Sequence, residues 1–184
     1  MGEPPIRPYP NPSPPVTLRS WNPRAPEVAA RVVALIVERL PDTRVEHVGS
    51  SSVPGCAGTG TLDLAIPYRD DAHLSAINDV LFALRFGRQR NRDPFPETRP
   101  MRTGAIDEEG ETFLLHVHVV PENTHHLAEL IDFRDRLRAD PALVAEYVAA
   151  KRAILDAGVR DGVDYAEKKG TFIAALGYTS AEDA

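Results

Sequence analysis

The spacing of apolar residues predicts a domain in which strands fill the first two thirds of the chain and helices fill the last third. Apolar residues recur at helical intervals from Pro26 to Leu40 and from Asp71 to Leu84. Two β-rich runs, Arg44 to Val48 and Thr61 to Pro67, lie between these helices. Beyond Pro121 the pattern is wholly helical, with helices expected over Thr124 to Ala139, Pro141 to Ala157 and about Tyr165 to Leu176.

The middle of the chain predicts the rest of a sheet. Phe86 to Arg90 is a possible strand, and a charged, proline-rich loop from Arg92 to Pro100 is expected to be mobile. Met101 to Ile106 and Thr112 to Val120 flank a turn-forming segment and predict a β-hairpin. The fold class is therefore α+β, with a mixed β-sheet covered by helices and a helical C-terminal third.

The N-terminal segment differs in composition from the remainder. Residues 1–15 hold seven of the 17 prolines and few apolar residues, so we expect a flexible arm outside the fold. Residues 16–184 then form a single domain, which suits a chain of 184 residues that is 42% hydrophobic.

Charge and cysteine content narrow the function classes. The formal net charge of −6 does not supply the basic surface that duplex nucleic acid requires. The single cysteine, Cys56, cannot form an internal disulfide, which favours a reducing compartment. The longest apolar run, Val32 to Val37, is too short for the roughly 20 residues of a membrane span. We expect a cytoplasmic protein with no membrane partner, and the sequence leaves its oligomeric state open.

The segment from His47 to Gly55, with the sequence HVGSSSVPG, is the first candidate for chemistry. A strand that ends in glycine and serines presents hydroxyls and backbone N–H groups, which can form an anion cradle for a phosphate. The candidate phosphate-binding residues are Gly49, Ser50, Ser51 and Ser52. The alternative is an ordinary glycine-serine turn.

Asp63 is the second candidate, because it lies within an otherwise apolar strand. Burying a carboxylate is costly unless it is paired, hydrogen-bonded or bound to a cation. A divalent metal ion is one explanation, and hydrogen bonds from backbone N–H groups are the other.

The HVGSSSVPG segment followed by Leu62-Asp63-Leu64 resembles the signature of the GrpB family, a UPF0157-type family with a nucleotidyltransferase-like fold. Other motifs agree in order along the chain. They are Val16-Thr17 with Trp21, His116 to Val119, Phe133 to Arg138, Tyr147 with Lys151, and Tyr165 with Lys169 and Phe172-Ile173. The resemblance covers about residues 16–178. It implies a loop and a strand carboxylate that hold a nucleotide or phosphorylated ligand with a divalent metal, Mg²⁺ or Mn²⁺ first and Zn²⁺ as an alternative.

The chain also departs from that pattern. Nucleotidyltransferases of this fold place two carboxylates two residues apart, so that both face the metal, but Ala65 stands at the second position. A neighbouring strand offers His116 and His118 where a third carboxylate is usual. Thr59-Gly60 replaces the usual Lys-Pro and removes a cation.

His116 and His118 lie two residues apart in a strand and therefore project to the same face. With Asp63 they could ligate one divalent metal, and Asp63 with His118 would carry the chemistry. The alternative is a hydrogen-bonded structural pair. His47 either contacts a phosphate or caps the end of its strand.

Basic and aromatic residues of the last third complete the candidate site. Arg134 and Arg138 share a helix face and could converge on an anion, or could instead form surface ion pairs. The resemblance adds Lys151, Tyr165 and Lys169 as ligand-binding residues. His125 and His126 are expected at the surface.

Three functions remain open at this point. The first is metal-dependent binding of a nucleotide, with transfer of a nucleotidyl group to an unknown acceptor. The second is a binding module without catalysis, which the missing carboxylate at Ala65 supports. The third is another small-molecule transferase or ligase reaction in the same cleft, because one fold hosts many reactions.

Overall fold

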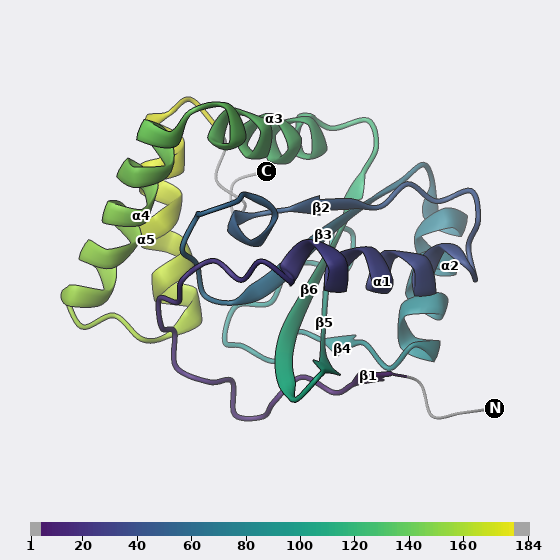
Figure 1. The fold of residues 1–184 in the computed structure, drawn as a ribbon. Coiled ribbons are helices and arrows are strands. Elements are labelled where there is room, and N and C mark those ends of the chain that lie inside the picture. The colour runs from purple at the N-terminus through teal and green to yellow at the C-terminus, as the bar shows by residue number, and fades with distance from the viewer. Residues whose placement is uncertain (1–4, 179–184) are drawn as a thin grey trace.

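The computed structural model describes residues 5–178, in which a mixed sheet carries helices on both faces (Figure 1). The strands are β1 (Ile6–Arg7), β2 (Glu46–Val48), β3 (Thr61–Tyr68), β4 (Gly87–Arg88), β5 (Met101–Glu108) and β6 (Glu111–Pro121). The helices are α1 (Ala25–Val37), α2 (Asp71–Ala83), α3 (His125–Ala139), α4 (Pro141–Asp156) and α5 (Gly162–Ala175), with a short 3-10 turn, η1 (Ser50–Ser52). The expected α+β class is confirmed.

The sheet has the order β1-β5-β6-β3-β2, and β4 pairs with the outer edge of β5. Only β3 and β6 run parallel among the described strand pairs. Their register places Asp63 opposite His116 and Ala65 opposite His118. Because side chains alternate along a strand, all four residues point to the same face.

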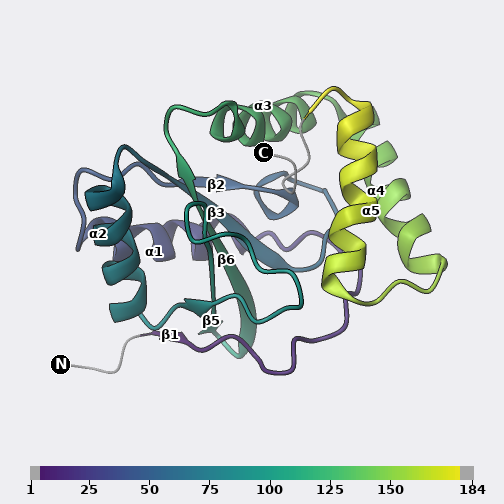
Figure 2. The ribbon, with the colours of Figure 1, turned by 180° about the vertical axis from the view of Figure 1, so that it is seen from behind.

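The other face of the sheet forms the main core. Leu62, Leu64 and Ile66 of β3 pack with buried residues of α1 and α2. Figure 1 shows α1 lying across this face, whereas Figure 2 shows the opposite face with α3, α4 and α5 along its rim. One face is therefore closed by the main core, and the face that carries Asp63 combines polar side chains with a smaller apolar cluster at Ala65.

The N-terminal arm is not separate from the fold. Ile6 pairs with Ile106 in β5 and has no exposed surface, so it belongs to the main core. Arg7 Nε donates a hydrogen bond to Asp107 Oδ2 at 2.7 Å. The expectation that residues 1–15 stay outside the fold is therefore wrong for this stretch, while residues 1–4 lie outside the described range. A lone isoleucine among prolines has no periodicity that could reveal this burial.

Boundaries of the other elements differ by a few residues from those expected. The hairpin turn contains only Glu109 and Gly110, both with positive φ, because β5 continues through Glu108. The possible strand at Phe86 to Arg90 shortens to the two residues of β4. Asp140 caps the N-terminus of α4 by accepting hydrogen bonds from the N–H groups of Ala142 and Leu143. Within residues 5–178, no helix combines the length and the hydropathy that crossing a membrane needs.

Candidate functional site

Asp63 and two histidines form a polar cluster on the open face of the sheet. The Oδ1 atom of Asp63 lies 3.6 Å from His116 Nδ1 and 3.7 Å from His118 Nε2. The Asp63 side chain is 26% exposed, so solvent reaches the cluster. The expected projection of His116 and His118 to one face is confirmed, and the parallel pairing of β3 with β6 places Asp63 beside them.

The two imidazoles govern the charge of Asp63. Burial acts to raise the pKa of Asp63, but hydrogen bonding and charge from His116 and His118 outweigh burial and hold that pKa far below its usual range. Asp63 is therefore an anion at any physiological pH. Within the described residues, no group of three or more histidine, cysteine, aspartate or glutamate side chains is arranged to hold a metal ion. Metal binding at this cluster stays a prediction.

Ala65, the position of the missing carboxylate, is sealed by apolar packing. It has no exposed surface and lies in a cluster with Val48, Val120 and Leu127. Leu127 comes from α3, which covers this end of the face. A second carboxylate here would be buried among hydrocarbon groups. The residues present therefore do not fit a two-metal centre.

The loop after β2 is shaped by Gly49 and by internal hydrogen bonds. Gly49 has φ of 69°, and a Cβ at this position would overlap the Asp63 carboxylate. The Ser52 hydroxyl donates to the carbonyl of Gly49 at 2.6 Å. The Ser51 hydroxyl lies 3.0 Å from His47 Nε2, and burial lowers the pKa of His47 to about 4, so this imidazole is neutral. Ser51, Ser52 and His47 thus stabilise the loop.

Ser50 is the serine of the loop that remains available. Within residues 5–178, the structure contains no hydrogen-bond partner for its hydroxyl. A Cβ added to Gly58 would overlap Ser50 Oγ and would lie 4.0 Å from Lys151 Nζ. The hydroxyl and the amine therefore both lie close to the side of Gly58 on which a Cβ would stand.

Lys151 lies beneath this loop and is 2% exposed. Its amine donates to the carbonyl of Ala57, lies 3.6 Å from Cys56 Sγ, and sits 4.2 Å from the centre of the Tyr147 ring. Burial lowers the pKa of Lys151 to about 8, with a further contribution from Lys169. Lys169 is therefore close enough to act on the same charge.

Tyr165 is also buried in this region, and its hydroxyl has no hydrogen-bond partner in the described structure. Burial raises the pKa of Tyr165, so the hydroxyl stays protonated. An unsatisfied buried donor calls for an explanation such as a water or a ligand.

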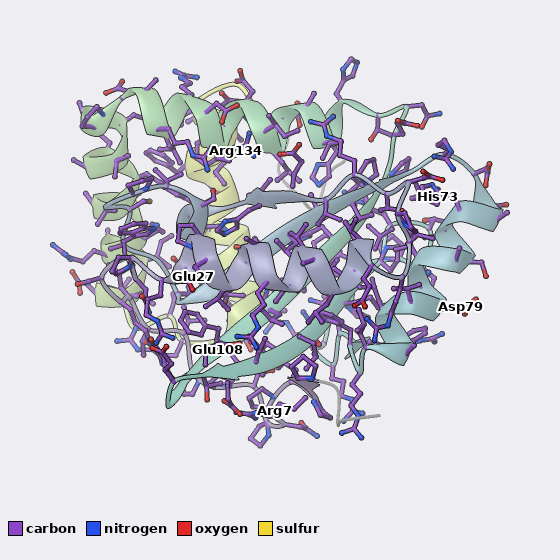
Figure 3. The ribbon with its side chains drawn as sticks, turned by 45° about the vertical axis from the view of Figure 1, so that its right-hand side comes forward. Arg7, Glu27, His73, Asp79, Glu108 and Arg134 are labelled. Atoms are coloured by element: carbon purple, nitrogen blue, oxygen red, sulfur yellow. The ribbon has the colours of Figure 1, made fainter. Side chains whose placement is uncertain are left out.

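Arg134 and Arg138 donate hydrogen bonds to the backbone around the serine loop and do not point into an open cleft. Arg134 Nη1 donates to Glu46 at 2.8 Å and to the carbonyl of His47 at 3.1 Å, from its place between α3 and β2 (Figure 3). Arg138 donates twice to the carbonyl of Ser52, from Nε at 3.1 Å and from Nη2 at 2.9 Å. Both guanidinium groups also pair with Asp135. The two arginines do converge, but on the backbone before and after Gly49.

Two aromatic residues at the cluster were missed by the sequence analysis. The Tyr9 ring packs on His116 with centroids 5.6 Å apart, and the Phe95 ring meets His118 edge-on at 5.9 Å. Both come from proline-rich segments, which have no apolar periodicity that could indicate such contacts. His126 is also buried and not at the surface, and its Nδ1 has no partner in the described range.

Comparison with known proteins gives a consistent family assignment. Residues 15–177 match the family described as GrpB protein. A UPF0157 protein of Streptomyces coelicolor is 34% identical over 135 residues, covering 73% of this chain and 67% of that protein. A UPF0157 protein of Halalkalibacterium halodurans is 28% identical over 167 residues, covering 88% and 80%.

Solved structures agree on the fold. The crystal structure of conserved protein GrpB from Enterococcus faecalis matches with a TM-score of 0.67 at 20% identity, over 87% of this chain and 94% of that one. The Cid1 poly(U) polymerase with MgGTP bound matches with a TM-score of 0.52 at 13% identity, over 73% of this chain but only 44% of the polymerase. This likeness shows a nucleotidyltransferase-like fold. The family match over nearly the whole described chain, joined to the loop and strand geometry above, places this protein in the GrpB family.

Proposed function

We propose that this protein binds a nucleotide or another phosphorylated ligand at the loop formed by residues 49–52. The observation that carries the proposal is that Ser50 Oγ and Lys151 Nζ both lie within 4.0 Å of the position that a Cβ of Gly58 would take. A hydroxyl donor and a cation at one point suit a phosphate oxygen. Lys169 adds positive charge nearby, and the Tyr165 hydroxyl offers an unused donor in the same region.

Asp63 is the residue proposed to interact with a divalent cation that accompanies the phosphates. One of the similar solved polymerases is described with a magnesium nucleotide, which makes Mg²⁺ or Mn²⁺ the first choice. The nearby imidazoles of His116 and His118 make Zn²⁺ the alternative, because nitrogen ligands favour that ion. Such an ion would neutralise phosphate charge. Asp63 would contribute its permanent negative charge, and the histidines would orient its carboxylate.

Binding without turnover is the function that this geometry favours. Nucleotidyl transfer by two metal ions needs a second carboxylate in the site. At Ala65 that carboxylate would be buried among apolar side chains, which disfavours its charge. Nucleotidyl transfer to an unknown acceptor is the second candidate. Two features favour transfer: Asp63 is accessible to solvent, and His118 Nε2 lies 3.7 Å from Asp63 Oδ1.

Calorimetric titration of ATP, CTP, GTP and UTP, each with and without Mg²⁺ or Mn²⁺, tests binding. We expect Ser50→Ala to weaken binding about tenfold, the typical cost of one hydrogen bond to a charged group. Ser75→Ala, at an exposed serine of α2, is the matched control and should bind like the parent. Absence of binding to all four nucleotides and to tripolyphosphate in the parent protein would refute the proposal.

The cation is tested with Asp63→Asn, which keeps the shape of the side chain and removes its charge. We expect this variant to lose the metal-dependent part of the affinity. Asp79→Asn, on the exposed surface of α2 and far from Arg134 in Figure 3, is the control. A pyrophosphate-release assay then separates the candidates: no release supports a binding module, and release that depends on Asp63 establishes transfer.

A further inference from the structure

A cavity of about 110 Å³ opens beside the same loop; Ala25 of α1 contributes to its lining and Asp63 does not. Its lining includes the loop residues Ser50, Ser51 and Gly58 together with Arg19 and Trp21. Ser50 therefore belongs both to the proposed binding loop and to the lining of this cavity.

Arg19 is fixed in position by the loop. Its backbone N–H donates to the Gly58 carbonyl at 2.8 Å, and its carbonyl accepts from the Gly58 N–H at 3.0 Å. Its side chain lies along Gly60, where an added Cβ would come within 3.2 Å of Arg19 Cδ and 3.5 Å of Nη1. Gly60 has φ of 80° and leaves the room that the guanidinium occupies.

The charge of Arg19 is not neutralised within the described structure. No carboxylate of residues 5–178 lies within salt-bridge distance of its guanidinium. Glu111 also lines the cavity, but it accepts two hydrogen bonds from Asn22 at 2.9 Å and lies 3.8 Å from Arg24. The carboxylate at the cavity rim is thus committed to other partners, whereas the cation is not.

We infer that Arg19 is a phosphate-binding residue and that this cavity holds a terminal phosphate group of the ligand. The inference rests on the proposed function and deepens it by adding a second cation to Lys151. Arg19 and Ser50 both line this cavity, and Lys151 Nζ lies 4.0 Å from the position that a Cβ of Gly58 would take. A guanidinium and a hydroxyl that line one cavity can together offer several N–H and O–H donors to one anion.

Trp21 reports on this cavity directly. It is the only tryptophan of the chain, it lines the cavity, and its Nε1 donates to the Ser51 carbonyl at 3.0 Å. An anion that binds beside Ser50 should therefore change the fluorescence of Trp21. Tripolyphosphate is the probe, because it contains phosphate groups without a base or a sugar.

The experiment titrates tripolyphosphate at fixed ionic strength and follows Trp21 fluorescence in the parent, Arg19→Met, Arg19→Lys and Arg152→Met. We expect a saturable change in the parent, about tenfold weaker binding in Arg19→Met, and partial recovery in Arg19→Lys. Arg152 is exposed on α4, so its variant should match the parent. Circular dichroism of each variant checks that the fold is kept.

The failures of the two proposals are distinguishable. Parent-like binding by Arg19→Met, while Ser50→Ala weakens calorimetric binding, would overturn the role of Arg19 and leave the proposed function standing. Calorimetric binding with no change in Trp21 fluorescence would place the phosphate outside the cavity and overturn the inference alone. If the parent binds neither tripolyphosphate nor any nucleotide, both proposals fail.

Discussion

The backbone of Gly49 lies directly against the carboxylate of Asp63: a Cβ built on Gly49 would overlap Oδ2 and lie 3.1 Å from Cγ. The loop and the carboxylate are thereby held in a single arrangement. We expect Gly49→Ala to lower the free energy of unfolding by about 2–4 kcal/mol, because it combines a steric clash with a backbone conformation essentially restricted to glycine. Gly110→Ala, where φ is 82° and no atom lies within 4 Å, should lose only the backbone part. If urea denaturation shows that Gly49→Ala and Gly110→Ala lose equal free energy of unfolding, the contact between Gly49 and Asp63 adds nothing to stability.

The Arg138 guanidinium connects α3 to the end of the serine loop. Arg138→Met leaves the buried carbonyl of Ser52 without its two donors, which should cost about 1–3 kcal/mol of unfolding free energy and weaken ligand binding. Arg152→Met should change neither quantity. Denaturant unfolding and calorimetry measure both, and a stable variant with parent-like affinity would show that the loop holds its shape without Arg138.

Lys151 makes stability depend on pH above neutrality. Its pKa is about 8 in the fold and 10.5 ordinarily, so between these values the unfolded chain binds more protons and stability rises with pH. In the parent protein the free energy of unfolding should rise with pH by on the order of 1–3 kcal/mol, and Lys151→Met should remove this rise. Urea denaturation of both proteins between about pH 7 and pH 9.5 compares the slopes. The same slope in both would mean that the amine is not desolvated.

His126 makes the protein sensitive to acid. Burial lowers the pKa of His126 from 6.5 to about 4, so in this window the unfolded chain takes up a proton that the folded chain does not, and stability falls as pH falls. His126→Leu should reduce the loss of unfolding free energy by about 1–3 kcal/mol at pH 4.5. The variant should still lose some stability in acid because burial also lowers the pKa of His47 to about 4. His125→Leu, at the exposed neighbouring residue, is the control and should retain the full acid sensitivity.

Restoring the second carboxylate tests whether the site could be returned to a two-metal centre. We expect Ala65→Asp to cost several kcal/mol, since the new charge would be buried beside Val48 and Leu127, and to gain no metal-dependent turnover. Ala153→Asp, at an exposed position of α4, should cost less than about 1 kcal/mol. A stable Ala65→Asp variant that binds Mn²⁺ would contradict this account of the departure from the family pattern.

The sequence predicts those parts of the fold that have local signals. The helices α1, α2 and α4 follow apolar periodicity and proline or aspartate caps, and the alternation of His116 and His118 places them on one face. Their meeting with Asp63 depends on the parallel pairing of β3 and β6, of which the family resemblance implied only that the two strands are neighbours.

The remainder depends on contacts between distant segments. Cys56 and Lys151 are 95 residues apart in the chain, and no local pattern indicates that the lysine lies beneath the loop. The sequence shows that Thr59-Gly60 lacks the lysine of the family pattern. It does not predict that the Arg19 guanidinium lies against Gly60. The same holds for Tyr9 over His116, since an aromatic residue among prolines gives no indication of its partner.

Two very short strands share the outer edge of β5: β4 pairs with Arg102 and Thr103, and β1 pairs with Ala105 and Ile106. An uncovered strand edge is a template for pairing with another molecule. Pro5 and Pro8 flank β1 and have no N–H group to donate, so the ladder cannot be extended past it. The N-terminal strand thus covers the part of the β5 edge that β4 leaves unpaired, and removing it would open the edge at Ala105 and Ile106 to a second copy of the chain.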